Sequence, residues 1–369
     1  ASDSAPRIGR PQQLAQLMAE RTRLIRHTID KALQQERQTA RERSRSVDEM
    51  PLHSQLAGFR EILLHDFSES DFADMYAQTI CYGLFAARFQ KRASEAFTRE
   101  TATFRLPRSN PFLARTFVRI GGTELDERVT WVVDDLARVL ARTDINEILR
   151  QFRGETRRDD PVVYFYEDFL AAYDQTIRET RGVYYTPGPV VSYIVRAIDR
   201  VLSQTFGIAR GLADDGKIPV PTPEGGMAEA HRVQILDPAA GTGTFLYAIF
   251  KHLHHEYFTG MEGAWPDYVR EHLLPRLFGF ELLMAPYAIA HLKLNLKLQE
   301  QDCTLEGGER INLFLTNALE EPQESAHPPM FTQWLKDEAT AANDVKRDRP
   351  VMVVLGNPPY SGESMNPSW

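Results

Sequence analysis

The residues best suited to chemistry lie near the end of the sequence, in the stretch NPPY at residues 357–360. The apolar run at 351–355 predicts a buried strand, and Gly356 predicts its end. Two consecutive prolines fix φ and lack backbone N–H groups, so the stretch can neither extend a sheet ladder nor start an ordinary helix turn. We therefore predict a stiff loop at a strand end that presents one amide, one backbone carbonyl and one aromatic ring.

A second chemical feature is the sequence DPAAGTGTF at residues 237–245. Its glycines let a ligand approach the backbone. The N–H groups at the start of a following helix can donate hydrogen bonds to a polar or anionic group of that ligand. A dinucleotide site would need a third glycine, where this sequence has Leu246, and an acidic residue about 20 positions on. A phosphate-binding P-loop would need Gly-Lys-Ser/Thr, which is missing here. The acidic residue comes later, at Glu281, and its carboxylate suits a ribose diol. The ligand that remains possible is a nucleoside with a charged tail, and S-adenosylmethionine fits that description.

These residues follow strands that alternate with helices from residue 181 onward. Strands are predicted at 233–239, 276–282, 311–317 and 351–357, and helices at 188–204, 243–258 and 286–300. Such alternation with apolar strands predicts a parallel sheet covered on both faces, whose ligands lie at the carboxyl ends of the strands. That edge would carry four polar side chains, those of Asp237, Glu281, Asn317 and Asn357. The Pro- and Gly-rich segment 211–230 is predicted as a surface loop.

The first half of the sequence shows only helical patterns. A long polar helix is predicted over 11–46, further helices over 128–141 and 164–177, and another after Asp144. Ser68 and Asp71 form the pattern of a capping box at the start of an apolar-periodic helix. This half is predicted to be all-helical.

Composition bounds the class of protein. The chain has 369 residues, of which 43% are hydrophobic and 25% charged, and this composition is ordinary for a globular protein. Its net charge of −8 argues against a strongly basic nucleic-acid-binding protein. No apolar run reaches the length of a membrane span, and two cysteines fit a reducing cytoplasm. We predict no metal site: His252, His255 and Glu256 are expected on an exposed helix face. Lys293 and Lys297 are expected to be solvated.

Taken in order, DPAAGTGTF, GFEL and NPPY resemble the motif series of amino-group DNA methyltransferases. The sequence RGVYYTPGPVVSYIV at 181–195 resembles their additional cofactor-binding motif, and its position first in the series is typical of gamma-class adenine-N6 enzymes. The helical half resembles the coupler of type ISP restriction–modification enzymes. The resemblance implies an α/β fold: a Rossmann-like class I methyltransferase sheet at 181–369, incomplete at its C-terminus. A helical arm at 1–50 and a coupler-like domain at 51–180 would precede it.

The resemblance also implies a function and a set of site residues. The function is S-adenosylmethionine-dependent methylation of the adenine N6 amino group in double-stranded DNA, as part of a restriction–modification enzyme. The residues implied to bind the cofactor are Tyr185 and Thr186 at its methionine end, Asp237, Ala239, Gly241 and Gly243 in the same region, Glu281 at the ribose and Asn317 at the adenine. At the position of Asn317 many relatives have an aspartate.

The NPPY loop explains how such a transfer would proceed. The exocyclic amine of adenine is a poor nucleophile because its lone pair is conjugated with the ring. Acceptors on its two hydrogens, the Asn357 side-chain oxygen and the Pro358 carbonyl, would free that lone pair and stabilise the developing charge. Tyr360 would stack on the base, which must be flipped out of the duplex.

Two other functions stay open at this point. One is methylation of a protein glutamine or an RNA base, for which NPPY loops also serve. The other is a catalytically silent coupler or scaffold fragment. Because only four strands are predicted, we expect further domains of the same polypeptide for target recognition, with or without helicase and nuclease domains, and no methylation by the isolated chain.

Overall fold

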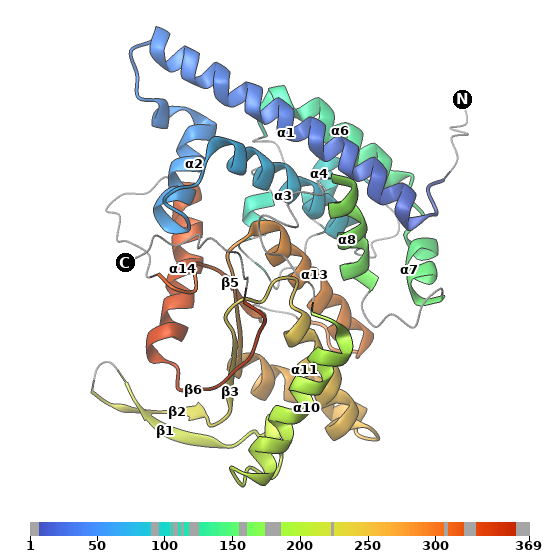
Figure 1. The fold of residues 1–369 in the computed structure, drawn as a ribbon, viewed down its shortest axis with the longest axis vertical. Helices are drawn as coiled ribbons and strands as arrows, with labels where there is room; N and C mark the ends of the chain where they lie inside the picture. The colour runs from blue at the N-terminus through green and yellow to red at the C-terminus, as the bar shows by residue number, and fades with distance from the viewer. Residues whose placement is uncertain are drawn as a thin grey trace.

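A computed structural model gives the fold of the chain. It describes residues 7–89, 96–103, 105, 110, 112, 114–117, 125–154, 161–173, 186–222, 225–305, 309–320 and 330–358. Figure 1 shows helices stacked above a small sheet that is itself flanked by helices. None of the described helices combines the length and the apolar composition that a bilayer crossing needs.

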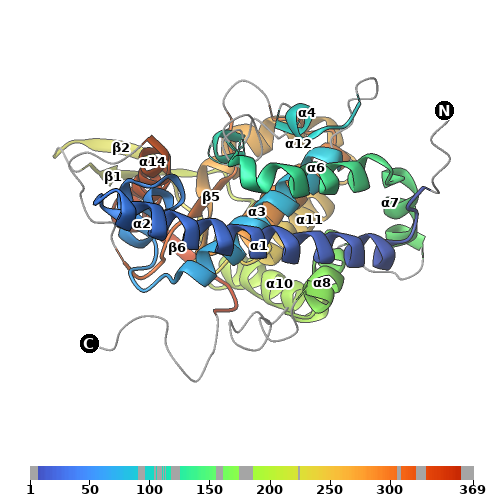
Figure 2. The ribbon, with the colours of Figure 1, turned by 90° about the horizontal axis from the view of Figure 1, so that it is seen from above.

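The described residues from 7 to 173 form helices, as predicted, and pair as strands only at an isolated bridge between Ile8 and Thr143. The helices are α1 (Pro11–Glu42), α2 (Pro51–Ile62), α3 (Glu69–Phe89), α4 (Arg99–Thr103), α6 (Glu127–Ala141), α7 (Ile145–Gly154) and α8 (Pro161–Tyr173). Ser68 caps α3 as predicted, because its hydroxyl accepts the Asp71 N–H at 3.0 Å. Figures 1 and 2 show α1 lying along α6, with apolar side chains such as Leu14 and Ile25 fully buried.

Four strands form the predicted parallel sheet, in the order β5-β4-β3-β6. They are β3 (Gln234–Asp237), β4 (Leu277–Glu281), β5 (Asn312–Leu315) and β6 (Val351–Val354). The helices between them are α11 (Thr244–Phe258), α13 (Met284–Glu300) and α14 (Met330–Asp348), and α10 (Gly188–Gln204) precedes them. Because all four strands run in one direction, their carboxyl ends meet at one edge, as expected.

Covering of both faces is confirmed for three strands and is wrong for β6. One face contributes Ile235, Leu277 and Leu313 to the main core, and the other packs Phe278, Phe280 and Phe314 against α14. Val354 pairs with Leu236 on that second face, yet it is 63% exposed, because α14 packs on β5 and β4 and β6 lies at the other edge of the sheet. Apolar residues in a strand therefore did not guarantee a second covering layer here.

The segment 211–230 is not a plain loop, contrary to the prediction. It contains a hairpin of β1 (Lys217–Pro221) and β2 (Met227–His231), paired antiparallel from Lys217–His231 to Pro221–Met227. Both views show the hairpin extending away from the sheet. Prolines remove ladder donors but are tolerated in edge strands, and each strand of a hairpin has a free edge. The Pro-rich composition was therefore misleading.

The helical half packs directly onto the helices of the sheet. Helix α3 contacts α13, and α2 contacts α14. A buried polar chain supports this packing: Asn110 donates to the Tyr287 hydroxyl at 2.9 Å, and that hydroxyl donates to Glu338 at 2.8 Å. Arg310 also donates to Glu338, at 2.9 Å. The main hydrophobic core is consequently continuous from α1 to β6.

Candidate active site

The turn between β3 and α11 has the conformation that its glycines predict. Gly241 and Gly243 have φ of 54° and 71°, a left-handed region that side chains rarely adopt. The open side of Gly241 faces empty space, so a ligand can reach its backbone. A Cβ at Gly279 of β4 would lie 2.9 Å from Leu246. Leu246, which occupies the position of the third glycine of a dinucleotide motif, therefore fills the space above Gly279 and packs α11 against the sheet.

Asp237 ends β3 and is 1% exposed. Its Oδ1 accepts the Ala239 N–H at 3.1 Å, while its Oδ2 is buried and accepts no hydrogen bond from the described residues. The pKa of this carboxyl is raised to about 7, mainly by burial and also by the nearby Glu281 carboxylate, against the lowering effect of the Ala239 N–H. A buried acceptor of this kind at a strand end is suited to a donor that a ligand would bring.

Glu281 ends β4 beside that turn. Its Oε2 accepts the Gly241 N–H at 2.8 Å, and its Oε1 accepts the N–H groups of Leu282 and Leu283 at 2.9 and 2.8 Å. Burial raises the pKa of Glu281, and these three backbone donors oppose that rise. The carboxylate thus joins the glycine turn to the second strand end, and its oxygens keep further lone pairs for hydroxyl donors.

Asn317 lies just after β5 and is 6% exposed. Its Oδ1 accepts the Leu319 N–H at 3.1 Å, and its backbone carbonyl accepts a hydrogen bond from the Lys346 ammonium of α14 at 2.6 Å. The same ammonium donates to the Glu320 carbonyl at 2.8 Å. Lys346 therefore holds the loop that presents Asn317, a role that the sequence did not indicate.

The NPPY loop starts where the sequence predicts. β6 ends at Val354, and the Leu355 N–H donates to Leu236 at 3.0 Å, which keeps the chain beside β3 up to Gly356. Gly356 is needed there, because a Cβ would lie 2.6 Å from the Asp237 Oδ1. Asn357 is half-buried and Pro358 is exposed. Tyr360, like Tyr185, lies outside the described residues.

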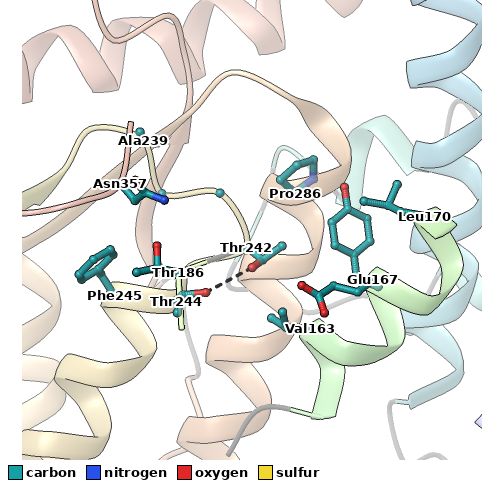
Figure 3. A pocket seen from close by; sticks show the side chains of 13 residues that line it. Val163, Glu167, Leu170, Thr186, Ala239, Thr242, Thr244, Phe245, Pro286 and Asn357 are labelled. Atoms are coloured by element: carbon teal, nitrogen blue, oxygen red, sulfur yellow. Dashed lines mark hydrogen bonds between the residues drawn. The ribbon is translucent and has the colours of Figure 1, made fainter. Parts of the chain in front are cut away.

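Asn357 and the glycine turn line one pocket, of about 720 Å³ with its mouth included. Three predicted residues besides Asn357 line it, namely Thr186, Ala239 and Gly241. Figure 3 shows Asn357 and Thr186 on the side of the turn, with the hydroxyls of Thr242 and Thr244 between that turn and α8. The other predicted residues that the structure describes are not among the lining residues: Asp237, Glu281 and Asn317 lie at or just after strand ends, and Gly243 lies at the start of α11.

Helix α8 supplies a wall of the pocket that sequence reasoning missed. Its lining residues are Val163, Tyr166, Glu167 and Leu170. Their spacing puts all four on one helix face. A signal was present in the sequence, because Glu167 interrupts an otherwise apolar helical stripe just ahead of the YYTP element.

Lys293 is a second correction. It is 2% exposed rather than solvated, and its ammonium lies 3.4 Å from the Thr244 hydroxyl and 5.2 Å from the centre of the Tyr247 ring. The ammonium also lowers the pKa of Asp237, against the effect of burial. Helix α13 packs between the helical half and the sheet, so a position that would face water in a smaller domain is covered here.

His252 is not on an exposed face either. Its Nε2 lies 2.9 Å from Asp199, which also accepts the Tyr257 hydroxyl and the Leu212 N–H. His255 and Glu256 are exposed, as expected. Among the described residues, no three His, Cys, Asp or Glu side chains are grouped as metal ligands would be.

Comparison with known proteins identifies the family to which the chain belongs. Residues 157–368, more than half of the chain, match the family described as N-6 DNA Methylase. No curated protein matches the chain significantly. The family match begins inside the predicted coupler range 51–180 and takes in all of α8.

Solved structures share the fold at low sequence identity. The type ISP restriction-modification enzyme LlaBIII bound to DNA gives a TM-score of 0.64 at 19% identity, over 96% of this chain and 21% of that one. The type ISP enzyme LlaGI with a DNA substrate mimic gives 0.60 at 18%, over 92% and 24%. The DrdV–DNA complex gives 0.59 at 23%, over 96% and 30%. The chain thus spans less than a third of each of these proteins.

Proposed function

Because the chain belongs to the N-6 DNA Methylase family, we propose that it methylates the N6 amino group of adenine in double-stranded DNA, with S-adenosylmethionine as methyl donor. The observation that carries this proposal is that Asn357 and the glycine turn at Ala239–Gly241 line one pocket. A cofactor held by the turn and an amine held by the amide would therefore meet in the same cavity. Proximity of this kind is what a direct group transfer requires.

The residues at the turn fit a charged nucleoside. Gly241 leaves its backbone accessible, and the threonine hydroxyls and the start of α11 offer donors to a carboxylate. The buried Asp237 Oδ2 and the Glu281 carboxylate offer acceptors for donors of the ligand. When bound, S-adenosylmethionine supplies an electrophilic methyl group on its sulfonium. Tyr185, Thr186, Asp237, Ala239, Gly241, Gly243, Glu281 and Asn317 would hold it.

The NPPY loop would bind the amine. The Asn357 side-chain oxygen and the Pro358 carbonyl accept its two hydrogens, which favours a pyramidal nitrogen with a free lone pair. Pro358 has no N–H of its own, and its exposed position leaves its carbonyl available to a base. Tyr360 would stack on that base once it has left the duplex.

We also propose that the chain works within a longer restriction–modification polypeptide. The three similar structures contain DNA or a DNA substrate mimic, two of them are of type ISP restriction-modification enzymes, and each protein is more than three times as long as the part that aligns. In that assembly, residues 1–50 and 51–180 would be the arm and coupler, and 181–369 the start of the methyltransferase sheet. A separate recognition domain would grip the duplex.

The cofactor part of the proposal is tested by calorimetry with S-adenosylmethionine. Glu281→Ala should weaken binding by about 1–3 kcal/mol, because a charged acceptor is lost. Glu256→Ala, on the exposed side of α11, is the matched control and should change nothing. Glu281 also accepts hydrogen bonds from three backbone N–H groups, so its removal could destabilise the fold. Thermal unfolding of each variant therefore distinguishes the loss of a contact with the cofactor from the loss of folded structure. Unchanged affinity in Glu281→Ala removes this residue from the site.

The transfer itself is tested in the complete polypeptide. Plasmid DNA treated with the protein and S-adenosylmethionine should carry N6-methyladenine at one defined sequence, as mapped at single-base resolution. A methylated cytosine or a methylated protein in place of adenine would contradict the proposed substrate.

A further inference from the structure

The wall of the pocket that α8 forms carries a single charge. Among the described residues lining the pocket, Glu167 is the one Asp, Glu, Lys, Arg or His, and its neighbours Val163, Tyr166 and Leu170 are almost fully buried. Figure 3 shows the Glu167 carboxylate pointing away from α8, toward the side of the pocket where Thr242 and Thr244 lie. A carboxylate in such a wall is a suitable acceptor for the N–H donors of a cationic ligand group.

The position of α8 is fixed from outside the pocket. Phe169 packs edge-on against Tyr82 of α3, with ring centres 4.9 Å apart, and stacks on Tyr173 at 5.5 Å. Tyr173 donates to the buried Asp74 of α3, and Arg23 of α1 donates to the Tyr173 carbonyl at 3.1 Å. The carboxylate of Glu167 is thus carried on a helix that is anchored at its far face and at its end.

Resting on the proposed function, we propose that Glu167 binds the α-ammonium group of the cofactor's methionine part. That part must lie near Thr186 and the glycine turn, which line the same pocket as Glu167. The ammonium offers three N–H donors, whereas the sulfonium offers none and cannot hydrogen-bond to a carboxylate. The ligand's own carboxylate is repelled by Glu167 and turns toward the threonine hydroxyls and the start of α11. Glu167 thereby orients the zwitterion, and the helical half takes part in cofactor selection.

The test compares two ligands that differ only in this ammonium. S-adenosylhomocysteine carries it, and the analogue with hydrogen in place of the α-amino group does not. The wild-type chain should bind the deamino analogue at least about tenfold more weakly, as expected for loss of a charged hydrogen bond. Glu167→Gln should lose at least about tenfold for S-adenosylhomocysteine but less than about twofold for the deamino analogue.

Two further variants keep the test decisive. Asp168→Asn, the adjacent acid on α8 that does not line the pocket, is the matched control and should bind both ligands like the wild type. Glu167→Ala should reproduce Glu167→Gln, and alanine favours the helix, so it serves if the glutamine variant does not fold.

The outcomes separate this inference from the proposed function. If the wild type binds both ligands equally, or if the Glu167 variants lose affinity equally for both, the ammonium contact is wrong while the methyltransferase proposal stands. If the wild type binds neither S-adenosylhomocysteine nor S-adenosylmethionine, both proposals fail.

Discussion

The wall of the pocket at the strand ends and the wall formed by α8 hold their residues by different means. Gly241 and Asn357 follow directly on β3 and β6, and short backbone hydrogen bonds to neighbouring strand ends fix their loops. Glu167 belongs to a helix that precedes the sheet in the chain and reaches the pocket only because α8 packs on α1 and α3. Local geometry therefore fixes the first wall, and tertiary packing fixes the second.

This difference predicts different losses when each wall is changed. A change at the strand ends should remove one chemical group and leave the fold intact. A change behind α8 should lower stability and cofactor affinity together, because the helix and its pocket face move as one unit.

The largest effect is expected at the strand ends. Asn357→Ala in the complete polypeptide should reduce methyl transfer to DNA by about a thousandfold or more, since a preorganised acceptor is lost in the transition state. Affinity for S-adenosylmethionine should stay within about twofold, because the amide acts on the adenine amine. Incorporation of a labelled methyl group and calorimetry measure the two quantities. Transfer at the wild-type rate would show that the proposed mechanism is wrong.

A smaller effect is expected behind α8. Phe169→Ala should lower the free energy of unfolding by roughly 3–5 kcal/mol, because a fully buried ring that contacts Tyr82 and Tyr173 is removed. Urea unfolding measures this loss. Tyr193→Ala on α10 is the control, since that ring is 67% exposed and its removal should cost less than about 0.5 kcal/mol.

Measuring the cofactor affinity of Phe169→Ala tests whether the position of α8 affects binding in the pocket. At temperatures where the variant is still folded, S-adenosylhomocysteine should bind more weakly than to the wild type. Wild-type affinity together with a large loss of stability would mean that α8 supports the fold and contributes nothing to the pocket.

The same difference between local geometry and tertiary packing decides which features could be predicted from the sequence. The parallel sheet, the glycine turn between a strand and a helix, and the common edge of Asp237, Glu281, Asn317 and Asn357 depend on patterns a few residues long, and they were predicted. Glu167, Lys293 and Lys346 depend on which helix covers which strand end, and a single sequence does not contain that information in any short window. The hairpin at 217–231 was missed for another reason, because its prolines argue against strands except at edges.

The most gradual effect, spread over several pH units, concerns Asp237, whose pKa burial raises to about 7 from an ordinary value of 3.8. In the unfolded chain this carboxyl ionises above about pH 4, whereas in the folded protein it keeps its proton up to about pH 7. The folded state therefore binds more protons in this window, and the free energy of unfolding falls as the pH rises from about 4 to 7. The slope from this one group is at most about 1.4 kcal/mol per pH unit.

Other groups titrate in the same window, so a variant must isolate Asp237. Burial also raises the pKa of Glu281, which adds to the fall, whereas burial lowers the pKa of His231 to about 4 and opposes it. Both contributions are shared by the wild type and by Asp237→Asn, which cannot ionise at this position. In urea unfolding at pH 4.5, 5.5, 6.5 and 7.5, the wild type should lose stability relative to Asp237→Asn as the pH rises. Parallel curves would mean that Asp237 is ionised throughout, and its buried oxygen would then need a cation or a donor close by even without cofactor.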